Sequence, residues 1–345
     1  MSYDTLLKID KLDYRDKRVL LIGGGYIGGE FCKALRAMRI EKATVITLSK
    51  KTASRRQKEY GYPAFSGGYF NVIPELANPF DLVIVATPVH ELKPAAEEAI
   101  RAGNKNILVE KPAALYSSSL EDWEREIPED TRVRIAYNRL VYPSLWKLKE
   151  IISKRKEQIT SCFYTFTEWT NTINFNNNKP QCYQRWGITN SLHVISMAHS
   201  IIDLPDEFFA ERTGSLPWHT AGSQFVGAGV TRKNIPFSYH ANWASAGRWG
   251  VEIMTPSNAY RLIPLEQLFC CSKGTVEWSP LEVGCAYPQC KTGIAEEIAV
   301  MLAPELEHFV ELVTIKRAIL FTRLAEKIFG YSSAHAKLKE STCPA

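Results

Sequence analysis

A glycine-rich segment between an apolar run and an amphipathic stretch restricts the fold of this chain more than any other feature. Residues 18–22 form the apolar run, residues 23–28 follow the pattern G-x-G-x-x-G, and residues 27–38 have helical spacing. Such glycines permit a tight turn, a close backbone approach to a diphosphate and close helix–strand packing. Free amides at the helix start attract the diphosphate. We therefore predict a dinucleotide site contacted by Gly23, Gly25, Tyr26, Ile27 and Gly28.

The rest of the first half alternates apolar and helical segments. Apolar runs occupy residues 43–48, 82–86, 106–109 and 133–136, and a helical stretch covers residues 91–102. Continuous apolar strands are buried on both faces, which is typical of a parallel sheet covered by helices on each side. Residues 1–136 are thus predicted to be a doubly wound α/β domain of the Rossmann type.

The pattern changes after residue 136, and 345 residues exceed what one hydrophobic core usually supports. Residues 137–345 are predicted to form an α+β domain with a large, mostly antiparallel sheet that leaves one face open. Helices are expected at 144–153 and 193–202, one or two more within 296–329, a loop at 171–179 and a frayed tail beyond 333. The strands are expected at 161–169, 222–231, 235–243, 249–255 and 259–263.

Composition excludes several classes of protein. The chain is 45% hydrophobic and 23% charged, with a net charge of +5, which is ordinary for a globular enzyme and predicts no nucleic-acid partner. No apolar run reaches membrane-spanning length, and the first eleven residues lack the apolar core of a signal peptide, so a cytoplasmic location is expected. The eight cysteines contain no C-x-x-C pair, which favours reduced thiols and predicts no metal site.

The end of the second strand bears on the choice of cofactor. A site that prefers NAD(H) places an acidic residue here to accept a hydrogen bond from the ribose 2′-hydroxyl. This chain has Ser49 and Lys50 instead, then Lys51, with Arg55 and Arg56 close by. A hydroxyl and cations suit a 2′-phosphate. NADP(H) is therefore predicted in preference to NAD(H), which stays possible. Ser49 and Lys50 are expected to contact the cofactor. The alternative is that these residues form only a basic surface turn.

Two later strands end in residues that suit the reacting end of a dinucleotide. Ala86-Thr87-Pro88 ends one, and Glu110-Lys111-Pro112 ends the next. Ligands of such sheets bind at the carboxyl ends of the strands. Lys111 is then placed near the nicotinamide, where an amine can accept or return a substrate proton. The further cofactor contacts expected here are Thr87, Pro88, His90, Glu110 and Lys111.

Together with Tyr137-Asn138-Arg139 and Pro143, these segments resemble the family of glucose–fructose oxidoreductase, inositol dehydrogenase and rhizopine catabolism (Gfo/Idh/MocA). The resemblance covers essentially the whole chain and implies an NAD(P)-dependent sugar dehydrogenase. In that family the lysine of Glu-Lys-Pro works beside a histidine on a helix of the second domain. The resemblance therefore implies a catalytic pair of Lys111 and His193, and places Asn138 near the nicotinamide.

The chain departs from the family around His193. The family has an aspartate four residues before the histidine and another acid three residues after it, where this chain has Thr189 and Ser196. Without acidic neighbours, a neutral imidazole is expected. Asn190, on the same helical face, is expected to orient a substrate hydroxyl. Aromatic and cationic side chains nearby are predicted to form a sugar-facing wall, although core positions are the alternative for each: Tyr183, Arg185, Trp186 and Trp169.

The function predicted from these residues is hydride transfer between NADP(H) and a hydroxyl or carbonyl carbon of a sugar or sugar-like molecule. Two alternatives stay open: a catalytically weak NADP(H)-binding regulatory or scaffold protein, and a reductase of a non-sugar carbonyl. The resemblance also implies a homodimer or higher oligomer that pairs through the open face of the antiparallel sheet. A cover from within the same chain would produce the same sequence pattern.

Overall fold

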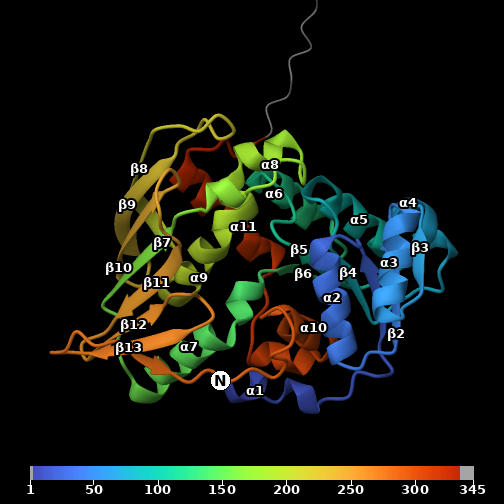
Figure 1. The fold of residues 1–345 in the computed structure, drawn as a ribbon, viewed down its shortest axis with the longest axis horizontal. Coiled ribbons are helices and arrows are strands. Elements are labelled where there is room, and N and C mark those ends of the chain that lie inside the picture. The colour runs from blue at the N-terminus through green and yellow to red at the C-terminus, as the bar shows by residue number, and fades with distance from the viewer. Residues whose placement is uncertain (1–2, 335–345) are drawn as a thin grey trace, which may run out of the picture.

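Two β-sheets stand beside each other, with helices packed between them, in the computed structural model of this chain, which describes residues 3–334 (Figure 1). The first sheet has six parallel strands in the order β3-β2-β1-β4-β5-β6. The order reverses between β1 and β4, which opens a crevice at the carboxyl ends of these strands. The strands are β1 (Arg18–Ile22), β2 (Lys42–Thr47), β3 (Ala64–Ser66), β4 (Leu82–Val85), β5 (Asn106–Glu110) and β6 (Arg132–Ala136). The predicted doubly wound fold is confirmed.

Helices cover both faces of this sheet because alternate strand residues point to opposite sides. Leu21 and Val45 pack in one core with Phe31 of α2, while Leu20 and Val83 pack in the other with Ala95 of α5. Helices and short turns of this half are α1 (Tyr3–Leu6), η1 (Ile9–Lys11), α2 (Tyr26–Ala37), α3 (Lys50–Tyr60), α4 (Tyr69–Val72), η2 (Ile73–Glu75), α5 (Val89–Arg101) and α6 (Ser117–Glu126).

The second sheet has eight strands in the order β14-β13-β12-β11-β7-β10-β9-β8, and only the β7–β10 pair is parallel. The predicted antiparallel character is therefore confirmed. Its strands are β7 (Ser161–Phe166), β8 (Pro205–Thr213), β9 (Gln224–Thr231), β10 (Pro236–Asn242), β11 (Trp249–Met254), β12 (Asn258–Leu262), β13 (Leu268–Ser272) and β14 (Ser279–Leu281).

One face of the second sheet is covered by helices of the same chain. Along β10, Phe237, Tyr239 and Ala241 are buried beneath α9 and α11, whereas Ser238 and His240 are exposed. The remaining helical segments are η3 (Asn138–Val141), α7 (Pro143–Arg155), η4 (Thr170–Thr172), α8 (Pro180–Gln184), η5 (Gly187–Ser191), α9 (Leu192–Ile202), α10 (Ile294–Leu302), η6 (Pro304–His308) and α11 (Ile315–Phe329).

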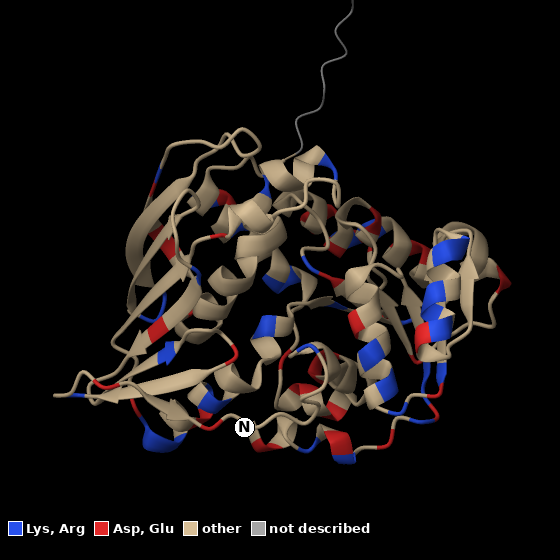
Figure 2. Cartoon of the chain, in the orientation of Figure 1, with Lys and Arg blue, Asp and Glu red and all other residues tan. Residues whose placement is uncertain are grey.

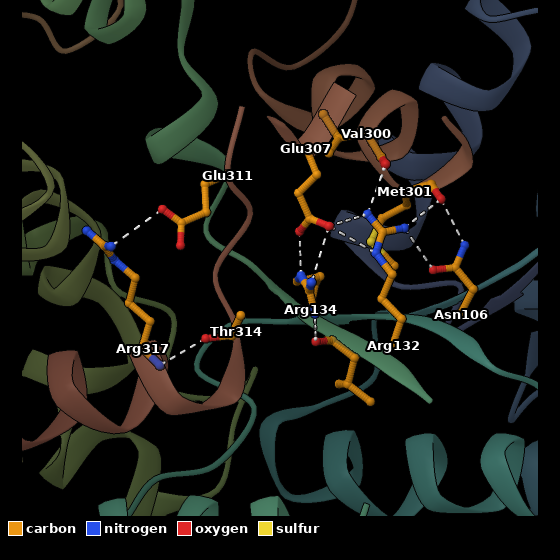
Figure 3. A network of polar contacts seen from close by, with 10 residues as sticks. Asn106, Arg132, Arg134, Val300, Met301, Glu307, Glu311, Thr314 and Arg317 are labelled. Atoms are coloured by element: carbon orange, nitrogen blue, oxygen red, sulfur yellow. Dashed lines mark hydrogen bonds and ion pairs between the residues drawn. The ribbon is translucent and has the colours of Figure 1, made fainter. Parts of the chain in front are cut away.

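The segment from α10 to η6 returns to the first sheet, beside α2 (Figure 1). Figure 3 shows Arg132 and Arg134 of β6 converging on Glu307 of η6, with nitrogen–oxygen distances of 3.0 Å and 2.5 Å. Arg132 also donates to the carbonyl oxygens of Val300 and Met301 at the end of α10. These contacts fasten residues 294–308 to the Rossmann half. The strands of the first sheet all end by Ala136, but a later segment packs on that sheet, so the division into two domains at residue 136 stays a prediction.

Several other expectations concern particular segments. Within residues 3–334, no helix combines the length and apolar composition that crossing a membrane requires. The seven cysteines of the described part are free thiols, and four of them are buried. Cys343 and nearly all of the tail predicted to fray lie outside the described residues.

Candidate active site

A cleft of about 960 Å³ lies in the crevice between β1 and β4. Its floor comes from the ends of the parallel strands, and its far wall comes from the loop before α8 and from η5. The lining residues of the first half include 22–27, 46–49, Thr52, Arg55, Gly68, Tyr69, 86–92, Glu110 and Lys111, and those of the second half are Asn177, Asn178, Trp186, Thr189 and Asn190. The cleft thus joins the glycine loop to the second domain.

The glycine loop requires glycine at two positions. Gly23 has a φ of 115°, and a Cβ there would lie 2.3 Å from the carbonyl oxygen of Ala86. At Gly28 a Cβ would lie 2.0 Å from the carbonyl oxygen of Gly23, so a side chain would push α2 off the loop. Gly25 caps α2 and faces open space. The free amides of α2 are consequently presented to the cleft, where a diphosphate would bind.

Arg56 of α3 holds the glycine loop from behind. Its buried guanidinium donates to the carbonyl oxygens of Gly24 (2.9 Å) and Gly25 (2.6 Å) and pairs with Glu59 (2.6 Å). This side chain is therefore occupied within the fold and is not free to bind a cofactor phosphate.

The start of α3 supplies the groups beside the expected ribose. Ser49 caps the helix, with its Oγ accepting from the amide of Thr52, and both residues line the cleft. Arg55 lines it as well, whereas Lys50 does not. Figure 2 shows that α3 carries many of the cations of this half of the molecule. Arg55 therefore borders the cleft, whereas Lys50, which was predicted to contact the cofactor, does not.

Thr87, Pro88 and His90 follow β4 and line the cleft, as does Glu110. The hydroxyl oxygen of Thr87 is buried without a hydrogen-bond partner among the described residues. An unpartnered buried hydroxyl is costly unless a ligand completes it. This orphaned group and the cradle at Gly25 both fit a bound dinucleotide.

Lys111 lies where β5 ends and is buried. Its Nζ donates to the carbonyl oxygen of Thr189 in η5. Burial lowers the pKa of Lys111; the Glu110 carboxylate opposes this shift, the Arg139 cation adds to it, and the Glu168 carboxylate opposes it more weakly. The amine is thus easier to deprotonate than an exposed lysine.

His193 lies one turn beyond Thr189, in α9, and is buried. Its Nδ1 has no hydrogen-bond partner among the described residues, and its ring centroid is 5.9 Å from that of Trp249. Burial holds the pKa of His193 well below its usual range, and the nearby cations Arg139 and Lys111 lower it further. The imidazole is neutral at ordinary pH. Lys111 and His193, predicted as a pair, are close enough to interact electrostatically, but His193 is not among the residues that line the cleft or the side cavity next to it.

An acid that was not predicted from the sequence lies near Lys111. Glu168 follows β7 and is buried, and its carboxylate accepts from Asn190 (2.8 Å) and from the Ser191 hydroxyl (2.6 Å). Both donors belong to η5, a π-helical segment of the kind often found at functional sites. Glu168 thus brings a carboxylate to the helix from another element, in place of the acids absent around His193.

Glu168 also lines a side cavity of about 260 Å³ that shares Asn177, Asn178, Trp186 and Asn190 with the cleft. Trp169 and Tyr183, both predicted to face substrate, line this cavity. Three of the four residues predicted for the sugar-facing wall are thereby brought together.

Arg185 and Asn138, which were also predicted for the site, are held by contacts within the fold. The guanidinium of Arg185 is buried, pairs with Glu326 (2.9 Å) and donates to the carbonyl oxygens of Leu115 and Ser332, so it has no donor directed into either cavity. Asn138 is buried and donates to the carbonyl oxygen of Thr292. It holds the loop before α10 and does not line the cleft. No group of three or more His, Cys, Asp or Glu side chains in residues 3–334 is placed to hold a metal ion.

Comparison with known proteins bears on the Rossmann half and on the fold as a whole. Residues 17–129 match the model of the oxidoreductase family with an NAD-binding Rossmann fold, Gfo/Idh/MocA. A search of curated proteins finds no match to the chain.

Similar solved structures cover nearly the whole chain. An oxidoreductase from Agrobacterium radiobacter, in complex with NAD+, L-tartaric acid and magnesium, is 14% identical, with a TM-score of 0.71 over 92% of this chain and 96% of its own. The UDP-N-acetylglucosamine 3-dehydrogenase of Acidithiobacillus ferrooxidans is 14% identical, with a TM-score of 0.69 over 92% and 98%. Levoglucosan dehydrogenase with NADH and L-sorbose is 17% identical, with a TM-score of 0.73 over 91% and 96%.

At such identities these likenesses show a shared fold, and the family resemblance rests on the match of residues 17–129. The predicted resemblance is confirmed. Residues 17–129 thus match the Gfo/Idh/MocA family of oxidoreductases, and the whole chain shares the fold of the NAD-binding oxidoreductases described above.

Proposed function

We propose that this protein transfers hydride between NADP(H) and a hydroxyl or carbonyl carbon of a sugar or sugar-like molecule. The observation that carries the proposal is the position of Lys111. It is a buried amine with a lowered pKa, at the point where the dinucleotide cleft meets Asn190 and the helix of His193. Neighbours of the same fold that act on sugars, such as levoglucosan dehydrogenase, support the substrate class.

The cofactor would lie along the carboxyl ends of the parallel strands. The amides of the glycine loop would hold the diphosphate, and the orphaned hydroxyl of Thr87 would gain a partner. When bound, the nicotinamide supplies the chemistry by accepting or returning a hydride.

The protein's own groups manage the proton. In oxidation, the neutral amine of Lys111 accepts the proton of the substrate hydroxyl as a hydride leaves the carbon that bears this hydroxyl. In reduction, the Lys111 ammonium returns the proton to the carbonyl oxygen. His193 is neutral and buried, so it acts as an uncharged hydrogen-bond partner of the reacting oxygen. Asn190 lines both cavities and orients a neighbouring hydroxyl.

Lys111→Ala tests this assignment. Turnover should fall by about 10²-fold or more, the usual contribution of a positioned acid–base group, while NADPH affinity changes little. Oxidation and reduction are followed by NADPH absorbance over a sugar and polyol panel, and binding by NADPH fluorescence. Lys105→Ala, which removes an exposed lysine from the same half, is the matched control. Unchanged turnover in Lys111→Ala would contradict the assignment.

The preference for NADP(H) rests on the start of α3. Ser49, Thr52 and Arg55 offer two hydroxyls and a guanidinium at the edge of the cleft, a set that suits a phosphate. A carboxylate that would repel a 2′-phosphate is missing from the lining residues of this edge, 46–49, Thr52 and Arg55.

We also propose that two copies pair through the open face of the second sheet. Phe209 of β8 and Val226 and Val230 of β9 are exposed there, Phe209 by 63%. Exposed apolar side chains gathered on one face are typical of an interface. Light scattering after gel filtration should give a dimer or larger assembly, and Phe209→Glu should dissociate it. A cytoplasmic location, where the NADP(H) pool is found, stays a prediction.

A further inference from the structure

We propose that the side cavity is a second subsite, which binds a neutral, hydroxylated ring such as the second sugar of a disaccharide or glycoside. This inference rests on the proposed function and extends it, because it makes the substrate larger than a single sugar. The cavity is bounded by the end of β7, the loop before α8, and η5.

The side cavity lies next to the cleft, so its occupant would be linked to the molecule that reacts in the cleft. Asn190 and Trp186 line both the cleft and the side cavity, and Thr189, next to Asn190, accepts from Lys111. A ring in the side cavity is therefore adjacent to a ring whose carbon reacts beside Lys111. Two linked rings would place one in each space.

The charges of the side cavity compensate each other. It is lined by one carboxylate, Glu168, and by one guanidinium, Arg248, whose nitrogen is 3.9 Å from a Glu168 oxygen. Arg248 is held in place between two aromatic rings, with its guanidinium carbon 4.5 Å from the centre of Trp169 and 4.4 Å from that of Trp249. A phosphate or an ammonium group would upset this balance, whereas a neutral ligand would not.

Hydrogen-bonding capacity remains on groups that line the cavity. A carboxylate has about four acceptor sites, and the chain uses two of those of Glu168 through Asn190 and Ser191. The indole nitrogen of Trp186 is buried and has no partner with hydrogen-bond geometry in the described part of the chain. Burial raises the pKa of the Glu168 carboxylate, and the nearby Trp186 indole lowers it in part. Asn174, Asn177 and Asn178 add amides.

Flat apolar faces complete the lining. Trp169, which lines the cavity, is 52% exposed overall, and Trp186 stacks on Tyr183 with their ring centroids 5.8 Å apart. The face of an aromatic ring can cover apolar surface of a ligand, while the N–H or O–H at the edge of a Trp or Tyr ring stays available for hydrogen bonds. A sugar ring matches this combination, because it has an apolar C–H face and a rim of hydroxyls that donate to carboxylates and accept from amides.

The test uses the full chain saturated with NADP+ and measures sugar affinity by calorimetry. The probes are the methyl glycosides of glucose, galactose and N-acetylglucosamine, and disaccharides that contain the same sugars. At least one disaccharide should bind about 10-fold more tightly than its matching methyl glycoside. This ratio should fall to within about 3-fold in Glu168→Gln and in Trp169→Ala. Trp278→Ala is the control, because Trp278 stacks on Arg261 away from both cavities.

Three results would overturn the inference: no disaccharide binds more tightly than its methyl glycoside, the advantage survives both variants, or only anionic probes such as glucuronides and sugar phosphates gain affinity. Trp169 is half-exposed, so its alanine variant should fold even if Glu168→Gln does not. Hydride transfer is measured separately on each sugar that binds. A retained affinity ratio without any turnover would reject the proposed reaction and leave the subsite intact.

Discussion

Arg55→Ser should weaken NADP(H) binding and leave NAD(H) binding nearly unchanged. Arg55 is the exposed cation at the edge of the cleft, and its guanidinium donates only a long hydrogen bond, 3.5 Å, to the carbonyl oxygen of Gly24 among the described residues. Its guanidinium is therefore available to a 2′-phosphate, which NAD(H) lacks. Serine keeps a hydroxyl at this position but removes the charge.

The magnitude follows from the exposure of the side chain. A hydrogen bond to a charged group contributes about 1.5–3 kcal/mol, and solvent screening places an exposed guanidinium at the lower end of that range. Since about 1.4 kcal/mol corresponds to a tenfold change in affinity, Kd for NADPH should rise about 10-fold. The neighbouring Arg56→Met should instead weaken both cofactors, because Arg56 holds the carbonyls of the glycine loop.

Fluorescence titrations with NADPH and NADH, at one fixed salt concentration, give the four dissociation constants that are needed. Lys58→Ser removes the same charge from α3 at a residue outside the cleft lining, and it should leave both constants unchanged. An equal loss of NADH and NADPH affinity in Arg55→Ser would refute the reasoning. So would an equal effect of Lys58→Ser on NADPH, which would indicate a general effect of charge.

Three further predictions concern other parts of the molecule. Gly28→Ala should abolish NADPH binding in fluorescence titrations, because the added carbon would lie 2.0 Å from a loop carbonyl oxygen; retained binding would contradict the close packing. Glu326→Ala should lower the free energy of unfolding by about 3 kcal/mol in urea, since Arg185 would stay buried without its partner, and a loss below about 1 kcal/mol would contradict this. The pH profile of sugar oxidation should have its acid limb well below the ordinary lysine pKa of about 10.4, and Glu110→Gln, which removes the carboxylate that raises the pKa of Lys111, should move that limb to lower pH; a limb that does not move would show that another group titrates.

The strands of the first sheet were largely predictable because burial on both faces selects unbroken apolar runs. The run at 18–22 coincides with β1, and that at 106–109 is one residue shorter than β5. Strand β8 was not predicted, since its sequence Pro-Asp-Glu-Phe-Phe-Ala-Glu-Arg-Thr is mostly exposed at the sheet edge and has no clean alternation. Strand β3 has three residues, too few to show any period.

In the candidate site, residues within local motifs could be predicted from the sequence, whereas contacts between residues far apart in the sequence could not. The glycine loop and Lys111 are found from neighbouring residues, because a strand end and a turn are encoded together. Glu168 takes its meaning from Asn190 and Ser191, which are 22 and 23 positions away. An acid within the aromatic strand predicted at 161–169 was the signal that the sequence offered. The burial of Arg185 depends on Glu326, 141 positions away, which no local pattern reveals.

The return of α10 to the first sheet affects how the protein is made. Ile298 and Met301 of α10 share a core with Leu21 and Val45, and Val313 bonds to Ile135 at the edge of the parallel sheet. On the ribosome, the N-terminal half therefore emerges with part of one face uncovered until about residue 313 has been synthesised. The antiparallel half is translated during that interval, so the two halves complete their cores almost together instead of one after the other.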